Sequence, residues 1–246
     1  MFDFLKDHPF SVDAFFERSV VLTYAVPKEE LQALIPECLE LDTFQDKWAF
    51  LAVAMVQTTG LRPAGFPKAF GNDFFLIGYR VFVRYKTREG KRLRGLYILR
   101  SQTDKKKMQF FGNLFTHYKY TTTDIKQSIT NKAYRISSAR SGLDVDFEDG
   151  DESTRLPEGS PFADWKEARR FAEPLPFTFT YNQAKKEVLI IEGVRENWHP
   201  KPLLVKHHDI GFIKTLQLKQ LVLANAFVIT DIPYHWKKGR KEIWKG

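Results

Sequence analysis

The sequence predicts a mainly β protein, a barrel or sandwich with short helices at its periphery. Many segments are rich in β-branched and aromatic residues, turn residues separate them, and few stretches show helical spacing of apolar residues. The chain has 246 residues, of which 43% are hydrophobic and 15% aromatic, so it can bury a sizeable core. Barrels and sandwiches of about 200–250 residues are often single domains. We therefore predict one domain over residues 1–246.

The first half of the chain alternates strands with two predicted helices. One helix is predicted over Lys28–Ile35, because Pro27 precedes it, glutamates occupy its first turn and Pro36 ends it. The other is predicted to run from an N-cap at Asp104 to Phe115. Strands are predicted at Arg18–Val26, Leu39–Phe44, Lys47–Thr58, Phe74–Tyr85, Leu93–Ser101, His117–Thr123 and Ile125–Ser137.

The second half begins with an acidic, turn-rich segment, Asp144–Ala163. We interpret it as a surface loop and not as a domain linker, because the strands before it need those after it to complete a sheet. Its acidic spacing does not fit a calcium loop, since Gly150 falls one place late. A short helix is predicted to start at Ser160–Pro161 and to run through Trp165–Phe171. A hairpin is predicted at Phe177–Tyr181 with Glu187–Arg195, and two further strands at Leu203–Phe212 and Ala226–Tyr234.

The cysteine content and the apolar runs predict a cytoplasmic protein with no membrane partner. Cys38 is the only cysteine, so no internal disulfide can form, which is typical of the reduced cytosol. The N-terminal segment carries Asp3, Lys6 and Asp7 among its apolar residues and does not fit a signal peptide. The longest apolar run, Trp48–Val56, is far shorter than the ~20 residues of a membrane helix.

The net charge of +8 is concentrated at the C-terminal end. Five basic residues face one acidic residue in the last dozen positions: Lys237, Lys238, Arg240, Lys241 and Lys245. Such a balance can indicate nucleic-acid or anionic-surface binding, and a solvated basic tail is the simpler interpretation. We predict that these side chains are exposed and bind nucleic acid only weakly and non-specifically.

Common cofactor and metal motifs are absent from the sequence. There is no glycine-rich nucleotide loop, no hydrolase nucleophile elbow, no HExxH and no CxxC. His207 and His208 are adjacent, so on a strand they point to opposite faces and cannot bind one metal ion together. We predict neither a cofactor nor a metal.

Residues Ala25–Pro67 resemble an uncharacterised bacterial branch of the acetoacetate decarboxylase superfamily. The shared features are a helix ending on Ile-Pro-Glu, then Leu-Glu-Leu, then an aliphatic strand leading to a Leu-Arg-Pro turn. Tyr79–Val83, Gly112–Tyr120 and Trp198–Leu203 extend the resemblance over most of the chain. The resemblance implies a closed, mostly antiparallel β-barrel around a small, largely apolar pocket.

In the decarboxylases that the chain resembles, a pocket lysine with a cationic neighbour forms a Schiff base with a keto acid. The resemblance places Lys119 at that position, and we predict that it faces the barrel interior, solvent exposure being the alternative. Tyr120 stands in place of the second lysine, Ala25 in place of the carboxylate-binding arginine, and Leu76 and Asn113 in place of two acids. We therefore do not expect an efficient acetoacetate decarboxylase.

Arg80 is the best substitute for the missing arginine, because it interrupts the apolar stretch Phe74–Val83. The alternative is that Arg80 pairs with an acid or lies at the barrel rim. His117, Tyr118 and Tyr120 combine polar atoms with aromatic rings, as pocket walls often do. Together with Asn113 they complete the predicted ligand pocket. On a strand, His117 and Lys119 would share one face and the two tyrosines the other.

Three functions remain open at this point. The first is a barrel that binds a small carbonyl or carboxylate compound, with Lys119 as a Schiff-base catalyst. The second is a non-catalytic binding or sensing module on the same scaffold, and the third is a nucleic-acid or anionic-surface binder. The oligomeric state is left open as well, a homo-oligomer included.

Overall fold

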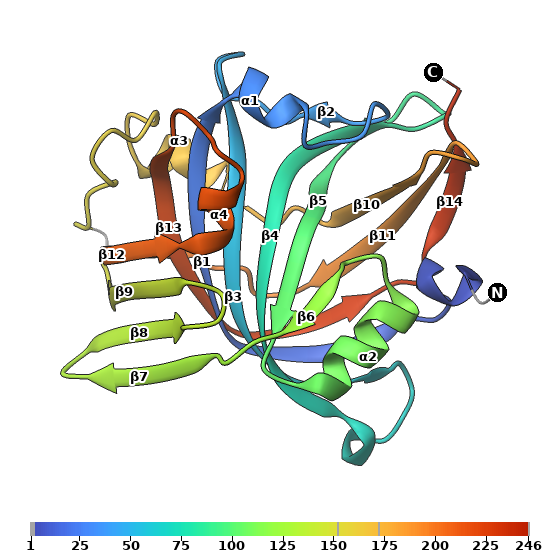
Figure 1. Ribbon diagram of the computed structural model, residues 1–246, viewed down its shortest axis with the longest axis horizontal. Helices are drawn as coiled ribbons and strands as arrows, with labels where there is room; N and C mark the ends of the chain where they lie inside the picture. The colour runs from blue at the N-terminus through green and yellow to red at the C-terminus, as the bar shows by residue number, and fades with distance from the viewer. Residues whose placement is uncertain (1–2, 152, 172, 246) are drawn as a thin grey trace.

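Long strands with buried apolar residues form the centre of the molecule. The computed structural model describes residues 3–151, 153–171 and 173–245. Figure 1 shows a large, strongly curved sheet with short helices at its ends. Its longest strands are β1 (Val12–Pro27), β3 (Trp48–Pro63), β4 (Asn72–Lys86), β5 (Arg92–Thr103) and β13 (Val222–Trp236). The predicted mainly β architecture with short helices is confirmed.

The remaining strands extend this sheet on both sides. They are β2 (Glu40–Leu41), β6 (Tyr120–Thr122), β7 (Lys126–Thr130), β8 (Ala133–Ser138), β9 (Leu143–Asp149), β10 (Phe177–Asn182), β11 (Glu187–Arg195), β12 (Lys201–Ile210) and β14 (Arg240–Ile243). The order is β14-β11-β10-β5-β4-β3-β1-β13-β12-β9-β8-β7, and β11 also pairs with β13. Most pairs are antiparallel, whereas β5 pairs in parallel with β6 and with β10.

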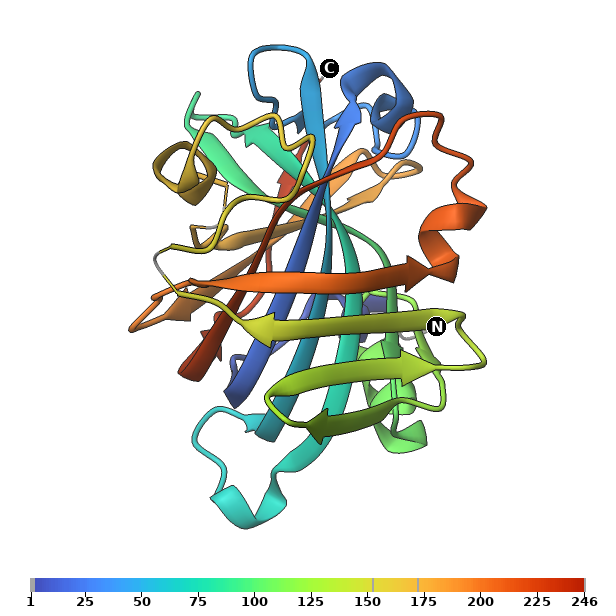
Figure 2. The same cartoon turned by 90° about the vertical axis from the view of Figure 1, so that its left-hand side faces the viewer.

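The strands β12, β9, β8 and β7 lie across the outside of the long strands (Figure 2). Buried residues such as Leu22, Met55 and Phe147 form the core between the two layers. A second core, with Phe50, Phe82 and Phe162, lies on the opposite side of β1, β3 and β4. We call the sheet face that carries this second core the inner face.

Short helices close the ends of the sheet. They are η1 (Asp3–Asp7), α1 (Lys28–Gln32), η2 (Lys68–Phe70), α2 (Lys106–Phe115), α3 (Trp165–Arg169) and α4 (Gly211–Thr215). In the described part of the chain, none of these helices is long and apolar enough to span a membrane.

Two local predictions in the first half are wrong. Leu39–Phe44 was predicted as a strand in a hairpin with the next one, but only Glu40–Leu41 is strand and it pairs with β4, and the turn to β3 keeps a single antiparallel bridge, Phe44 to Trp48. Asp104 does not cap α2, because its carboxylate accepts the backbone N–H of Phe75 at 2.8 Å. In both cases a contact distant in sequence replaces the local one.

The acidic segment was predicted to be loop from Asp144 onward, and this is wrong for its first part. Asp144 to Asp149 belong to β9, which pairs with β8 and β12. The strand buries Leu143, Val145 and Phe147 and turns the intervening acids outward, where Arg135 pairs with Asp144. Buried and outward-facing residues therefore alternate with the two-residue period of a strand, although the composition of the segment is typical of loops.

Candidate functional site

Arg80 lies in the middle of β4 with its side chain on the inner face. Leu76 and Phe82, at the same alternation, pack in the inner core. Arg80 pairs with Ala52 of β3 and with Ile98 of β5. Ala52 and Ala54 are small, so the sheet leaves room above β3 for the long arginine side chain.

Gly78 determines where the guanidinium group of Arg80 lies. A Cβ atom built on Gly78 would be 2.9 Å from Arg80 Nε and 3.0 Å from Nη2. The guanidinium therefore folds back over Gly78, toward Leu76. Successive residues whose side chains point to the same face of a strand are about 6.6 Å apart. Any side chain at position 78 would displace the arginine head group.

Tyrosines and a second arginine surround Arg80. Tyr118, Tyr120, Tyr234 and Arg195 all lie within electrostatic range of its guanidinium. The ring centroids of Tyr118 and Tyr120 are 6.4 Å apart, and Arg195 Nη1 donates a hydrogen bond of 2.9 Å to Tyr234 Oη. The cluster thus combines groups from β4, β6, β11 and β13.

Burial dominates the electrostatics of this cluster. Burial lowers the pKa of Arg80, and the nearby tyrosines Tyr234 and Tyr120 oppose that shift. Burial also raises the pKa of Tyr118, and it raises the pKa of Tyr120 to about 12. The two phenols are therefore protonated hydrogen-bond donors at neutral pH.

Neither arginine of the cluster has a carboxylate partner among the residues that the structure describes. Arg80 Nε makes no hydrogen bond, and neither do Nε and Nη2 of Arg195. Arg80 is surrounded by protein, yet part of its side chain remains exposed to solvent. An enclosed cation without a counter-charge is costly, and such groups usually have a bound partner.

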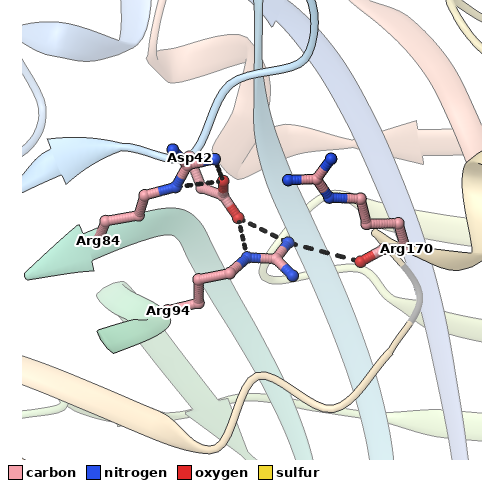
Figure 3. Close-up of polar contacts among 4 residues, drawn as sticks. All are labelled: Asp42, Arg84, Arg94 and Arg170. Atoms are coloured by element: carbon pink, nitrogen blue, oxygen red, sulfur yellow. Dashed lines mark hydrogen bonds and ion pairs between the residues drawn. The ribbon is translucent and has the colours of Figure 1, made fainter. Parts of the chain in front are cut away.

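Nearer the C-terminal end of β4, another arginine, Arg84, does have a carboxylate partner (Figure 3). Arg84 and Arg94, directly opposite each other on β4 and β5, both bind the fully buried carboxylate of Asp42. Arg94 Nη2 also donates to the backbone carbonyl of Arg170 at 3.4 Å. Within the part of the chain that the structure describes, the same strand pair therefore holds one arginine site with a carboxylate, at Asp42, and one without, at Arg80.

A cleft of about 410 Å³ lies between the start of β1, the end of β3, the start of β4, and α2. Pockets for small molecules typically measure roughly 300–1,000 Å³. Tyr118 and Tyr120 belong to its wall, so the cleft and the Arg80 cluster share two residues, and the wall also includes Leu76 of β4. Gly112 of α2 packs directly on the Tyr120 ring, where an added Cβ would approach to 2.4 Å.

Asn113 and His117, both predicted pocket residues, have other contacts. Asn113 Oδ1 accepts the backbone N–H of Tyr120 at 2.8 Å, and its Nδ2 donates to the Tyr120 carbonyl at 2.9 Å. His117 Nε2 lies 3.3 Å from Asp7 Oδ1. The structure therefore does not bring these two side chains to the Arg80 cluster, and Asn113 instead fixes the backbone that presents Tyr120.

Lys119 is exposed, so the prediction that it faces the interior is wrong. Its backbone adopts a left-handed conformation, with φ +54°, just before β6 begins. The predicted alternation does hold, because Tyr118 and Tyr120 are the pair that turns inward. Lys119 lies with His117 and Lys6 in a separate, outward-facing groove.

The sequence analysis missed Arg195 and Tyr234. A local signal existed for Arg195, because Gly193 and Arg195 repeat the spacing of Gly78 and Arg80 within an apolar strand. Gly193 lies against the Tyr234 hydroxyl, to which an added Cβ would approach within 2.2 Å. Tyr234 has no comparable signal, because it comes near Arg80 only when β13 pairs with β11.

The described residues contain no group of three or more His, Cys, Asp or Glu side chains that could hold a metal ion. What the site offers is hydrogen-bond donors: a guanidinium, phenols and the free N–H groups of a second guanidinium. Donors of this kind bind carboxylates and other oxyanions.

Solved structures of low sequence identity share the fold. Acetoacetate decarboxylase from Legionella pneumophila matches with a TM-score of 0.60 at 14% identity, over 95% of this chain and 88% of that chain. The enduracididine biosynthesis enzyme MppR, complexed with a condensation product of pyruvate and imidazole 4-carboxaldehyde, has a TM-score of 0.56 at 10% identity, over 95% and 89%. An acetoacetate decarboxylase-like enzyme from Sphingomonas wittichii has a TM-score of 0.52 at 13% identity, over 96% and 91%.

These similarities confirm that the predicted resemblance to acetoacetate decarboxylase holds at the level of the fold. No curated protein matches the chain in sequence. A family model matches residues 14–233, which include β1 through most of β13 and every residue of the Arg80 cluster except Tyr234. The chain therefore belongs to the DUF2071 family of uncharacterised conserved proteins.

Proposed function

We propose that the protein binds a small organic carboxylate on the inner face of its sheet, with Arg80 as the anion anchor. The observation that carries the proposal is the enclosed guanidinium of Arg80, for which the described residues provide no carboxylate. A bound carboxylate would supply the missing charge through charge-assisted hydrogen bonds. A carbonyl group on the same ligand could accept a hydrogen bond from Tyr118 or Tyr120.

Two further observations support this proposal. The related folds include MppR, whose structure contains a product derived from pyruvate. The pairing of β11 with β13 joins the two sides of the large sheet, and it supports the closed barrel in which we place the ligand. Lys119 has no part in this proposal, because its amine is on the outside.

The experiment compares carboxylates with matched neutral amides by isothermal titration calorimetry. The panel contains acetate, butyrate and phenylacetate, each with its amide. We expect the carboxylates to bind more tightly, and Arg80→Met to weaken carboxylate binding by at least about thirtyfold, as loss of a buried charged contact does. Exposed Arg140 provides the control, and Arg140→Met should leave binding unchanged.

Gly78→Ala is a second, milder variant. The three atoms nearest to the added methyl group all belong to the end of the Arg80 side chain, so the protein should fold normally while the guanidinium is displaced. Carboxylate affinity should fall, with little change in thermal unfolding. Equal binding of acids and amides, or wild-type affinity in Arg80→Met, contradicts the proposal.

A further inference from the structure

The cleft beside Arg80 narrows the chemical class of the ligand. Its wall is largely apolar and is formed by Phe16, Leu61, Phe74, Met108, Phe115 and Trp236, among others. These side chains come from β1, β3, β4, α2 and β13. An apolar ligand surface would be removed from water along the whole of this wall.

Several polar groups of the cleft wall are already bonded to the protein. Asn72 Nδ2 donates to the carbonyl of Leu61 at 3.4 Å, and Thr116 Oγ1 donates to the carbonyl of Gly112 at 2.7 Å. Arg62 uses Nε and Nη1 on the carbonyls of Phe66 and Gly60. Among the described residues, unpaired buried polar atoms are few on this wall, namely those of Thr58, His8 and Tyr118. A sugar or another polyhydroxylated ligand would therefore replace only a small part of the hydrogen bonds that it loses to water.

His8, which also lines the cleft, adds no charge near neutral pH. Burial lowers its pKa to about 4, and its Nδ1 has no hydrogen-bond partner. Lys107 contributes to the outer part of the wall and is exposed. Apart from apolar surface, the cleft therefore presents the two tyrosines, the Thr58 hydroxyl and Arg62, whose guanidinium bonds backbone carbonyls.

Arg80 is not itself one of the residues that line the cleft, but it lies on the same face of β4 as the wall residue Leu76. Arg80 folds over Gly78 toward Leu76, and Leu76 is itself a wall residue. Tyr118 and Tyr120 connect the same two regions, since they line the cleft and lie within electrostatic range of Arg80. A ligand that satisfies both regions has one anionic end and an extended apolar body.

We infer that the ligand is a monocarboxylate with an aliphatic or aromatic tail, bound with its carboxylate at Arg80 and its tail in the cleft. This inference rests on the proposed function, to which it adds the ligand class. The cleft volume of about 410 Å³ limits the length of the tail.

The test is a chain-length series of butyrate, hexanoate, octanoate and decanoate, with octan-1-ol as the neutral probe, measured by calorimetry. Burial of a methylene group contributes about 0.8 kcal/mol, so affinity should rise roughly fourfold per methylene until the cleft is full. On that basis octanoate should bind on the order of a hundredfold more tightly than butyrate. Octan-1-ol should bind more weakly than octanoate, because it lacks the charge for Arg80.

Two variants separate the two ends of the ligand. Arg80→Met should weaken every acid in the series and leave octan-1-ol unaffected. Leu61→Trp fills the cleft from a partly exposed wall position, and it should reduce octanoate binding while butyrate binding stays unchanged. Thermal unfolding of each variant verifies that it is folded.

The possible outcomes distinguish this inference from the proposed function. If butyrate and octanoate bind equally and both need Arg80, the ligand class is wrong and the proposed function stands. If octanoate and octan-1-ol bind equally without need of Arg80, both are wrong. Absence of binding across the series, in wild-type protein with normal thermal unfolding, also overturns both.

Discussion

Two arginines four residues apart on β4 differ in whether a carboxylate pairs with them. Arg84 shares the buried Asp42 with Arg94, whereas Arg80 has no acid partner among the described residues. If Arg80 is kept for binding, it should lower the stability of the unliganded protein. Residues retained for function often have this effect.

The first prediction follows from this contrast. Arg80→Met should raise the free energy of unfolding by about 1–3 kcal/mol, because it removes an uncompensated enclosed charge. Arg84→Met should lower it by about 1–3 kcal/mol, because Asp42 loses one of its two partners. Urea unfolding without ligand measures both changes. A destabilising Arg80→Met would indicate that an unrecognised partner already neutralises Arg80.

His8 should make stability depend on pH. Burial lowers its pKa from 6.5 in the unfolded chain to about 4 in the folded protein, so the unfolded state binds the proton more readily. The stability contribution is complete above about pH 6.5 and is lost as the pH falls to about 4. The loss amounts to at most about 3 kcal/mol.

His8→Asn isolates this effect. Asparagine tolerates the left-handed backbone at position 8, where φ is +53°, and it does not titrate. Urea unfolding at pH 7 and pH 4.5 should show a smaller loss of stability in the variant than in wild type. Burial also lowers the pKa of His208 in the same direction, so part of the acid destabilisation should persist. Identical losses in both proteins would contradict the assignment to His8.

At the scale of elements, α2 and β6 act as one unit that presents the tyrosines. Asn113 bonds both backbone groups of Tyr120, and Gly112 lies against the Tyr120 ring. Asn113→Ala should therefore lower the free energy of unfolding by about 1–3 kcal/mol. Asn113→Asp should also be destabilising, since it keeps the acceptor for the Tyr120 N–H but places a carboxylate oxygen against the Tyr120 carbonyl. Faster hydrogen exchange of the Tyr120 amide in Asn113→Ala would locate the effect, and unchanged exchange would contradict it.

The exposed position of Lys119 leads to a chemical prediction. Treatment with a keto acid and borohydride should give no more adduct at Lys119 than at Lys132, another exposed lysine. Mass spectrometry of peptides from the treated protein measures both sites. A selective adduct at Lys119 that disappears in Lys119→Ala would restore the Schiff-base hypothesis.

Elements with a strong local pattern could be predicted from the sequence. The hairpin of β10 and β11 and the central strands follow from alternation and β-branched residues, and their predicted and observed ranges overlap closely. Ile125–Ser137 was predicted as one strand, but it is β7 and β8 joined at Asn131 and Lys132, both with positive φ. Asn131 is a turn residue that tolerates positive φ, so a local signal for the break was present and was overlooked.

The candidate site was only partly predictable, for a related reason. Arg80 was identified as a charged residue within an apolar strand, and Tyr118 and Tyr120 as aromatic neighbours of Lys119, which the family resemblance placed in the pocket. Arg195 and Tyr234 join them only through the pairing of β11 with β13, which no local pattern encodes. The orientation of Lys119 depends on one left-handed residue, and sequence does not specify that conformation for lysine.

At the scale of the whole molecule, the basic C-terminal end is ordered. The prediction that its five basic side chains are exposed is confirmed. They do not form a free tail, however, because β14 pairs with β11. Acidic residues neutralise three of them: Lys237 pairs with Glu192, Arg240 with Glu242, and Lys241 with Asp7 and Glu187.

Nucleic-acid binding by this end should therefore be weak and should show a shallow salt dependence. Only Lys238 and Lys245 lack an acidic partner within residues 3–151, 153–171 and 173–245. Two phosphate contacts give a slope of about −2 in a plot of log affinity against log salt, and five would give about −4.5. From 50 to 200 mM salt, the affinity for a DNA duplex should thus fall about tenfold, and not several hundredfold.

Fluorescence anisotropy with two unrelated duplexes measures the slope and the selectivity. Glu192→Gln, which frees Lys237, should steepen the slope by about one. A slope near −4.5 in wild type, or sequence-selective binding at physiological salt, would show that the ion pairs do not mask these charges and would favour nucleic acid as a true partner.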